Sequence, residues 1–232
     1  MLFKSPVYSQ ASGSIAGITY SRNRGGMYAR ARAIPTDPAS AFQLANRNNM
    51  ADLVDAWIGI VSPAQRAAWK TYGDNVAMTN RLGETIFLTG QQHYVRSNLP
   101  RLQIGFPRVD DAPTIFDLGQ HTTPTVMFAY DTPSVVIAFE ETDVWCDEDA
   151  TALIIFASRE QNPSVNFFQG PYRLAGTIDG DSVSPPTSPQ IIASPFAYNI
   201  GNQAFARARI TRADGRLSAN IDLGNKTITA SP

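Results

Sequence analysis

The spacing of apolar residues changes once along this chain, and that change constrains the possible folds more than any other feature of the sequence. In the first half, Met50, Leu53, Val54, Trp57, Ile58 and Val61 recur with the period of a helix and would lie along one helical face. From Thr125 onward, short apolar or alternating runs are separated by turn residues, which is typical of β-strands. The expected fold class is therefore α+β, with the helices preceding the strands.

The second half of the chain is expected to form a β domain over residues 125–232. Turn sequences such as Asp179-Gly180 and Asp214-Gly215 separate its runs. About seven strands in roughly 105 residues is the pattern of an immunoglobulin-like or fibronectin-like β-sandwich. The expected strands are Thr125–Tyr130, Ser134–Phe139, Thr151–Ser158, Tyr172–Ile178, Ala204–Thr211 and Leu217–Leu223.

A small helical domain is expected over residues 39–102. Its first helix would run from about Ala39 to Ile60. Ser62 and Gln65 have the spacing of a capping box, in which each side chain accepts a hydrogen bond from the other residue's backbone N–H. A second helix is therefore expected to start directly after Ser62.

This second helix is expected to end near Gly73 and to pack on the first as an antiparallel pair. Ala68, Trp69 and Tyr72 would provide the contacts with the apolar stripe of the first helix. The helical spacing of Trp57, Trp69 and Tyr72 favours core packing over a ligand pocket.

The remainder of the helical region is less regular. Leu82–Leu88 has the composition of a strand, and Thr89-Gly90-Gln91-Gln92 is a second capping box that would start a helix through about Asn98. Pro100 is expected to stop that helix. Residues 103–124 contain several prolines and no clear period, so they are expected to form a linker between two domains.

Residues 1–38 are expected to form an extended basic arm that contains a β-hairpin. Ile15–Arg22 and Met27–Ile34 have strand composition and flank the four-residue loop Asn23-Arg24-Gly25-Gly26. The register that pairs Arg22 with Met27 places three further pairs on one apolar face: Tyr20 with Ala29, Ile18 with Ala31, and Ala16 with Ala33.

An isolated hairpin of this kind has too little apolar surface to be stable, so we expect other protein subunits to cover it. Fully extended, the first 38 residues could span on the order of 125 Å, at about 3.3 Å per residue, which is enough to reach a neighbouring subunit. The residues expected to contact a partner are Ile15, Ile18, Tyr20, Arg22, Arg24, Met27, Tyr28, Arg30 and Arg32.

Charge is strongly segregated along the chain. The formal net charge is −1, yet residues 1–40 carry +4 and residues 106–160 carry −9. The basic end of one molecule could therefore meet the acidic middle of another. A net negative chain with an acidic middle favours protein partners over nucleic acid for the arm arginines, and a homo-oligomer is expected.

No catalytic or cofactor site is expected. His93 and His121 lie away from any nucleophile motif, and Cys146, the single cysteine, has no local catalytic signature. The glycine-rich stretches lack the strand-to-helix context and the lysine of a phosphate-binding loop. We therefore expect a non-enzymatic protein.

Acidic residues offer the one arrangement that suits a metal ion. Asp147, Glu148 and Asp149, with Asp143 nearby, could supply the oxygen ligands that calcium prefers. The cluster lacks the glycine and the ordered spacing of a calcium-binding loop, so a solvated turn is the preferred interpretation.

Several short motifs in the first half of the chain occur together: Gly13-Ser14-Ile15-Ala16-Gly17, Arg30-Ala31-Arg32, Pro35-Thr36-Asp37-Pro38, Gln43, Arg47, Trp57, the run from Ser62 to Trp69, Thr89-Gly90, Asn98 and Pro100-Arg101-Leu102. Over about residues 13–113 the chain resembles a family of tailed-bacteriophage and prophage structural proteins. The resemblance implies a virion protein, assembled in the host cytoplasm with coat subunits or with neck or tail subunits. No apolar segment has the length of a signal peptide or of a membrane span, so no membrane association is expected.

The sequence is compatible with three functions. The leading hypothesis is a capsid-associated or decoration (cement) protein that docks on coat subunits through its arm. The second is a neck or tail subunit that uses the same arm in head-to-tail contacts. The third, of another class, is a carbohydrate- or host-surface-binding module in the β domain, for which Trp145 and scattered tyrosines would be the binding platform.

Overall fold

A computed structural model describes residues 11–23, 26–80 and 82–231. The chain divides into two compact units, Met1–Leu44 and Ala45–Pro232. The first unit holds a small sheet and the start of a helix. The second unit holds the rest of the helical region and a large sheet.

The first unit is built on a three-stranded antiparallel sheet. Its strands are β1 (Gly13–Ile15), β2 (Ile18–Asn23) and β3 (Gly26–Ala31), in the order β1-β2-β3. The register expected for β2 and β3 is confirmed, because Ile18 pairs with Ala31, Tyr20 with Ala29 and Arg22 with Met27.

Two details of the expected hairpin were wrong. Ala16 does not pair with Ala33, because Ala16 adopts a φ of 49° and turns the chain, so that Ile15 pairs with Ile18 in a further strand. The pairing of β2 with β3 also continues to Asn23 and Gly26, which leaves only residues 24–25 between the strands. These two residues lie outside the described ranges.

Three helices follow the arm: α1 (Ala41–Gly59), α2 (Pro63–Asn75) and α3 (Gly90–Gln103). Both capping boxes are confirmed, with Gln65 Oε1 accepting from the Ser62 N–H at 2.8 Å and Gln92 Oε1 accepting from the Thr89 N–H at 2.9 Å. Between α2 and α3, strand β5 (Thr85–Phe87) lies inside the stretch expected to be a strand, and it pairs with β4 (Ala77–Thr79), which was not expected. Among the helices described, none is both long and apolar enough to cross a lipid bilayer.

The expected stop of α3 at Pro100 was wrong, since the helix continues to Gln103. A proline inside a helix removes one N–H donor and crowds the carbonyl group four residues earlier, at a cost of about 3 kcal/mol. The next residue, Arg101, is held by several buried contacts with the sheet, and this tertiary interaction outweighs the local preference to stop.

An aromatic cluster centred on α3 holds the helices together. Tyr94 packs against Trp57 of α1 and Trp69 of α2, with ring centroids 5.3 Å and 5.6 Å away. α2 packs chiefly on α3 rather than on α1, in contrast to the expected antiparallel pair. Gly90 permits this close approach, because a Cβ at this position would lie 2.7 Å from the backbone N of Lys70.

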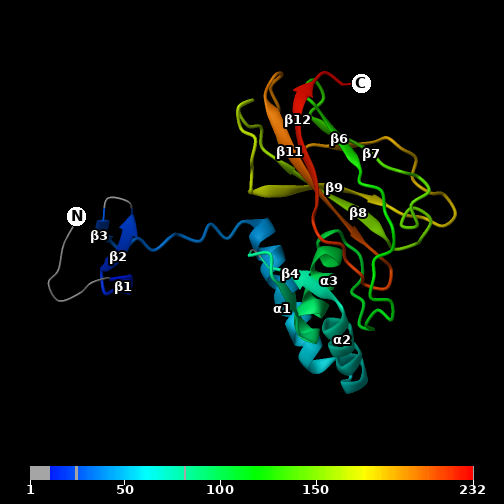
Figure 1. The fold of residues 1–232 in the computed structure, drawn as a ribbon, viewed down its shortest axis with the longest axis horizontal. Coiled ribbons are helices and arrows are strands. Elements are labelled where there is room, and N and C mark those ends of the chain that lie inside the picture. Colours follow the sequence, from blue (N-terminus) through cyan, green and yellow to red (C-terminus); the bar gives the residue numbers. More distant parts are fainter. Residues whose placement is uncertain (1–10, 24–25, 81, 232) are drawn as a thin grey trace. The chain divides into compact units, whose positions relative to one another are not determined.

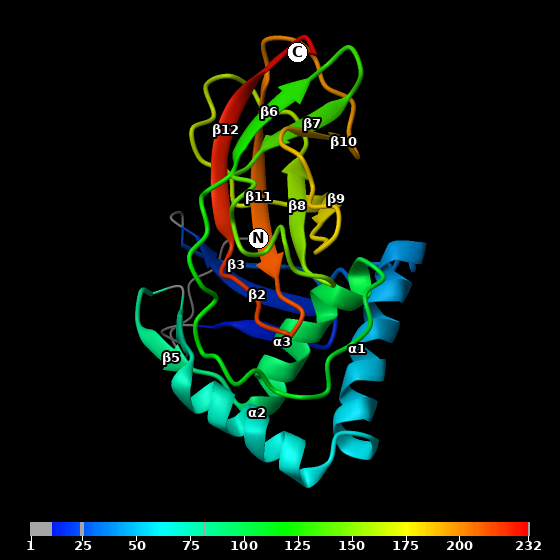
Figure 2. The same ribbon diagram turned by 90° about the vertical axis from the view of Figure 1, so that its right-hand side faces the viewer.

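The second unit also contains a seven-stranded mixed sheet. In the order β10-β7-β6-β12-β11-β8-β9, all neighbours are antiparallel except β12 and β6, which are parallel. Figure 1 and Figure 2 show the helices of this unit gathered at one end of the sheet and the C-terminus at the other. The strands are β6 (Thr125–Ala129), β7 (Ser134–Ala138), β8 (Ala152–Ser158), β9 (Tyr172–Asp179), β10 (Gln190–Ala193), β11 (Gln203–Thr211) and β12 (Ile221–Thr229).

The first five expected strands are confirmed, with small shifts at their ends. The sixth, Leu217–Leu223, was misplaced: the regular strand is Ile221–Thr229, while Leu217 only forms an isolated bridge with Thr211. β10 was not expected, because its four residues are too short to show an alternating pattern.

The sheet curls until it is nearly closed into a barrel. Its two edge strands, β9 and β10, approach each other at Gly176, where a Cβ would lie 2.7 Å from Cγ2 of Ile192. An immunoglobulin-like sandwich is not confirmed, because β12 pairs with both β11 and β6 and so joins the two halves into one continuous sheet.

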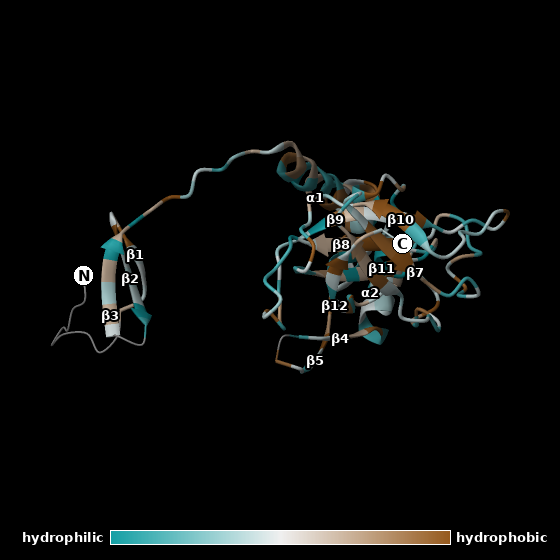
Figure 3. Ribbon diagram, turned by 90° about the horizontal axis from the view of Figure 1, so that it is seen from above, coloured by the Kyte–Doolittle hydropathy of each residue, from teal (hydrophilic) through white to brown (hydrophobic). Residues whose placement is uncertain are grey.

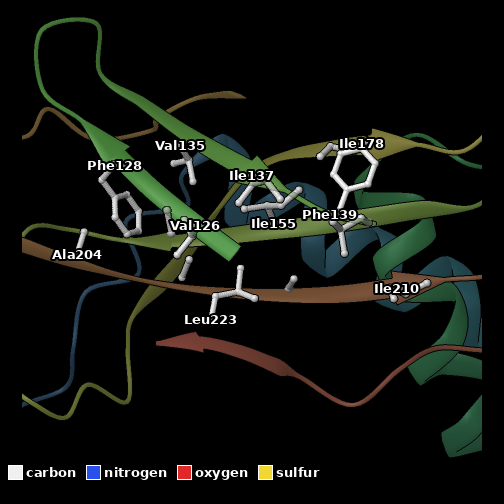
Figure 4. Close-up of a cluster of buried hydrophobic side chains, with 14 of the residues drawn as sticks. Val126, Phe128, Val135, Ile137, Phe139, Ile155, Ile178, Ala204, Ile210 and Leu223 are labelled. Atoms are coloured by element: carbon white, nitrogen blue, oxygen red, sulfur yellow. The ribbon is translucent and has the colours of Figure 1, made fainter. Parts of the chain in front are cut away.

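Apolar side chains from all sides of this sheet fill its interior. Phe128 and Ile137 are 0% exposed, as are Leu153 and Ile155 from the opposite wall. Figure 4 shows these walls facing each other across the core, and Figure 3 shows apolar residues concentrated in the strands. The curled shape lets one layer of strands enclose a dry core on its own concave side.

Arginine side chains join α3 to the sheet. Arg101 is 1% exposed, and its guanidinium donates to the backbone oxygens of Ala150 at 3.1 Å and Arg212 at 2.8 Å. One turn earlier on the helix, Arg96 donates to the backbone oxygens of Leu217 at 3.1 Å and Ser218 at 2.9 Å. The helices and the sheet therefore share buried polar contacts.

The segment 103–124, expected to be a linker, is anchored along its length. Asp110 accepts hydrogen bonds from Trp69 Nε1 through its backbone oxygen at 2.9 Å and from the Tyr94 hydroxyl through its carboxylate at 2.8 Å. Further on, the backbone oxygen of Asp117 accepts from Arg216 at 2.6 Å. The segment thus packs on the helices first and on the sheet afterwards.

Replacing Arg101 with Met should lower the free energy of unfolding by about 3 kcal/mol or more, because buried carbonyl groups would lose their donors at about 1–3 kcal/mol each. Urea denaturation of the full chain measures this change as a shift in midpoint. Lys70→Met is the matched control, since Lys70 pairs with Asp74 on the surface and such pairs contribute about 0.2–1 kcal/mol. Equal stability of the two variants would contradict the role given to Arg101.

Candidate interaction surface on the N-terminal arm

The pairing of β1, β2 and β3 separates their side chains onto two faces of different chemistry. Alternate residues of a strand point to the same face, and paired residues share a face. One face carries mainly apolar side chains, and we name it the apolar arm face. Its members are Gly13, Ile15, Ile18, Tyr20, Arg22, Met27, Ala29 and Ala31.

The opposite face is polar. Ser14 and Thr19 are paired across β1 and β2, and their hydroxyl oxygens are 2.8 Å apart, which shows directly that the two side chains share this face. Ser21, Asn23, Gly26, Tyr28 and Arg30 complete the polar arm face. The small sheet is therefore amphipathic, like the surface sheet of a larger protein, but the described residues of the arm form only one layer.

Most of the expected partner-binding residues are brought together by this sheet. Ile15, Ile18, Tyr20, Arg22 and Met27 lie on the apolar arm face, whereas Tyr28 and Arg30 lie on the polar one. Arg32 follows β3, and its backbone N–H donates to Gly17 O at 2.8 Å. Arg24 lies outside the described residues.

Burial in the arm is low. None of the described residues between 11 and 44 is buried, and Ile15 is 74% exposed while Ile18 is 45% exposed. Covering an isoleucine side chain contributes about 1.5–3 kcal/mol. Burial of the apolar arm face by a partner would therefore contribute free energy that contacts within the described part of the arm do not supply.

Cys146, considered above as a nucleophile, and Trp145, considered as a platform for a sugar, both lie in the protein interior. Cys146 is 0% exposed, and burial, together with the nearby acidic residues, raises the pKa of its thiol to about 12. A thiol of this kind stays protonated near neutral pH and is a poor nucleophile. Trp145 is 2% exposed and packs against Phe139, so its ring offers no surface platform for a sugar.

Asp147, one of the acidic residues weighed as metal ligands, is exposed, and the other three bind groups elsewhere in the fold. Glu148 forms an ion pair with Arg212, and a carboxylate oxygen of Asp149 accepts from the Ser182 N–H at 2.8 Å. Asp143 accepts hydrogen bonds from Thr122. In the described ranges, no three His, Cys, Asp or Glu side chains gather in an arrangement that could hold a metal ion.

His93 is a buried titratable group of α3 that bears on the pH dependence of stability. It is 0% exposed and packs against Tyr72, and neither ring nitrogen has a hydrogen-bond partner among the described residues. Burial, reinforced by the nearby Arg96 guanidinium, lowers the pKa of His93 to about 4. The imidazole is therefore neutral in the folded protein near neutral pH.

Because the folded pKa of His93 lies below the ordinary value of about 6.5, the unfolded chain binds this proton first as pH falls. The contribution of His93 to stability is present above pH 6.5 and is lost between about pH 6.5 and 4, by up to about 1.4 kcal/mol per pH unit. His93→Leu should remove this part of the pH dependence in urea denaturation at several pH values. His121→Leu, at an exposed imidazole, should keep it; identical profiles for the two variants would refute the assignment.

Comparisons with protein-family models, with curated proteins and with solved structures find no match to this chain. The function is therefore inferred from the arm, from the distribution of charge and from the motifs in the first half of the chain.

Proposed function

We propose that this chain is a structural subunit of a tailed-bacteriophage virion and that it docks on neighbouring subunits through its N-terminal arm. The observation that carries the proposal is the amphipathic three-stranded sheet of the arm, in which no described residue is buried. Its apolar face includes Ile15, Ile18, Tyr20 and Met27. A single-layer sheet with such a face gains stability when a partner supplies the second layer.

The energy available from this face is sufficient for a specific contact. Full burial of an exposed large apolar side chain contributes about 1.5–3 kcal/mol, and the face offers Ile15 and Ile18 as exposed side chains, with Tyr20 and Met27 half-buried beside them. Part of that energy is offset by the loss of freedom when the arm is ordered on its partner. The net free energy of binding is therefore consistent with an arm that becomes fixed in position when it binds a partner subunit.

The motifs favour a virion role, and the number of copies per particle distinguishes the positions within it. The resemblance of residues 13–113 to tailed-phage structural proteins supports a virion role, and a capsid-associated or decoration (cement) protein is the leading form of the proposal. A neck or tail subunit would use the same arm in a ring of fewer copies. Copies per particle in the hundreds, counted by quantitative mass spectrometry, indicate the capsid, and about a dozen indicates the neck or tail.

Ile18→Asp in the full chain should reduce incorporation into purified particles by about tenfold or more, because a carboxylate on the apolar arm face would be desolvated on docking. Incorporation is measured as copies of the chain per particle after density-gradient purification. Ser21→Asp is the matched control: it adds the same charge to the same strand on the polar arm face, and incorporation should remain close to normal.

Equal incorporation of the wild type and both variants would exclude docking through the apolar arm face. Urea denaturation of each variant shows whether the body of the protein is intact. The cooperative unfolding of Ala45–Pro232 should be the same in all three proteins, since neither substitution lies in that unit.

A further inference from the structure

Helix α1 leaves apolar side chains uncovered within the second unit. Met50 is 41% exposed, Ile58 66% and Ile60, directly after the helix, 60%. By contrast, Leu53 and Ala56 on the same helix are buried, and Leu53 belongs to the apolar cluster that contains Trp69 and Tyr94. The apolar stripe of α1 is thus wider than the intramolecular packing requires.

A groove of about 450 Å³ runs along this helix. We call the apolar part of its lining, Leu53, Ala56, Ile60 and Leu102, the floor, and the polar part of its lining the margin. The complete lining is Asn49, Asp52, Leu53, Asp55, Ala56, Ile60, Leu102 and Arg108. An apolar floor with charged groups at the margin is the usual composition of a protein-binding groove.

The charge at the margin of this groove is negative. Asp52 and Asp55 are exposed, and neither forms an ion pair with any described residue. The one cation of the lining, Arg108, is held by Asp110, with its Nε 2.9 Å from a carboxylate oxygen. A partner should therefore present apolar side chains together with a positive charge.

The apolar arm face has this combination. Among its described residues, Arg22 is the one charged side chain, and it lies in line with Ile18 and Tyr20 on β2. The distance from Ile18 to Arg22 along a strand is about 13 Å, and that from Asn49 to Ile60 along a helix is about 16 Å. The two surfaces are thus similar in length and opposite in charge.

A second apolar groove beside α1 is a poorer match. It has a volume of about 420 Å³ and includes Met50, Val95 and Leu99, but its charged lining residue is Arg96. Arg96 would repel Arg22 of an arm docked there. Because of its negative charge, the groove that carries Asp52 and Asp55 is therefore the better docking site for the apolar arm face.

We propose that the apolar arm face of one copy of this chain docks in the Asp52/Asp55 groove of a second copy. Ile18 and Tyr20 would cover the floor, and Arg22 would pair with the two carboxylates. Each copy carries both surfaces, so the contact is head-to-tail and can generate a ring or an extended array. This inference rests on the proposed function and names the partner of the arm.

Arg22→Glu in the full chain should weaken self-association by about tenfold or more, because two like charges would face the new carboxylate. Sedimentation velocity over a range of protein concentrations measures the apparent Kd. Arg30→Glu is the matched control: it makes the same change on the polar arm face, where it should alter the apparent Kd much less. Asp52→Lys with Asp55→Lys should weaken association as strongly as Arg22→Glu.

Exchanging the charges of the arm and the groove tests whether the arm of another copy occupies the groove. The chain that combines Arg22→Glu, Asp52→Lys and Asp55→Lys should associate nearly as well as the wild type. Mixing the Arg22→Glu chain with the Asp52→Lys/Asp55→Lys chain should also restore association, because each arm then meets a groove of opposite charge on another copy. No rescue in either the combined chain or the mixture would mean that Arg22 does not face Asp52 and Asp55 of another copy, and would overturn the proposal.

Two further results would overturn it. One is a wild-type chain that remains monomeric at every concentration, and the other is an Asp52→Lys/Asp55→Lys chain with an unchanged apparent Kd. Neither result would contradict the proposed function if Ile18→Asp still reduced incorporation into particles. In that case the arm would dock on a different virion protein.

Discussion

The buried guanidinium of Arg101 is the interaction on which the arrangement of the second unit depends. It belongs to the last turn of α3 and donates to backbone oxygens on two separate loops of the sheet, at Ala150 and Arg212. A guanidinium has five donors in a rigid fork, so one side chain can satisfy several carbonyl groups at fixed angles. Because α3 is fixed in this way, Tyr94 and Leu102 on the same helix are placed where α1 and α2 pack against them.

The two units differ in how they are stabilised. The unit Ala45–Pro232 has a large apolar core inside the curled sheet and a second core centred on Trp69 and Tyr94. The sheet of the arm has no buried residue among those described. In the proposed assembly, the stable unit supplies a preformed groove and the arm supplies a surface that is completed on contact. Ordering of the arm then adds specificity at a cost in affinity.

Local signals predicted local structure well. The capping boxes at Ser62 and Thr89 place the starts of two helices correctly, because the hydrogen bonds of a cap lie within four residues of chain. The pairing of Arg22 with Met27 followed from the alternation of residues on either side of a turn. Pro100 shows the limit of this reasoning, since contacts made by its neighbour with the distant sheet kept the helix intact.

Patterns in short stretches of the chain predicted the α+β class, the helix starts, most strands and the register of the arm, because each of these depends on residues close together in the chain. The single curled sheet could not be predicted in this way, since the pairing of β12 with β6 joins residues about 100 positions apart. The tertiary structure likewise decided that Asp52 and Asp55 border an apolar groove with Leu102. Long-range contacts of this kind depend on how whole elements pack, and no short pattern records them.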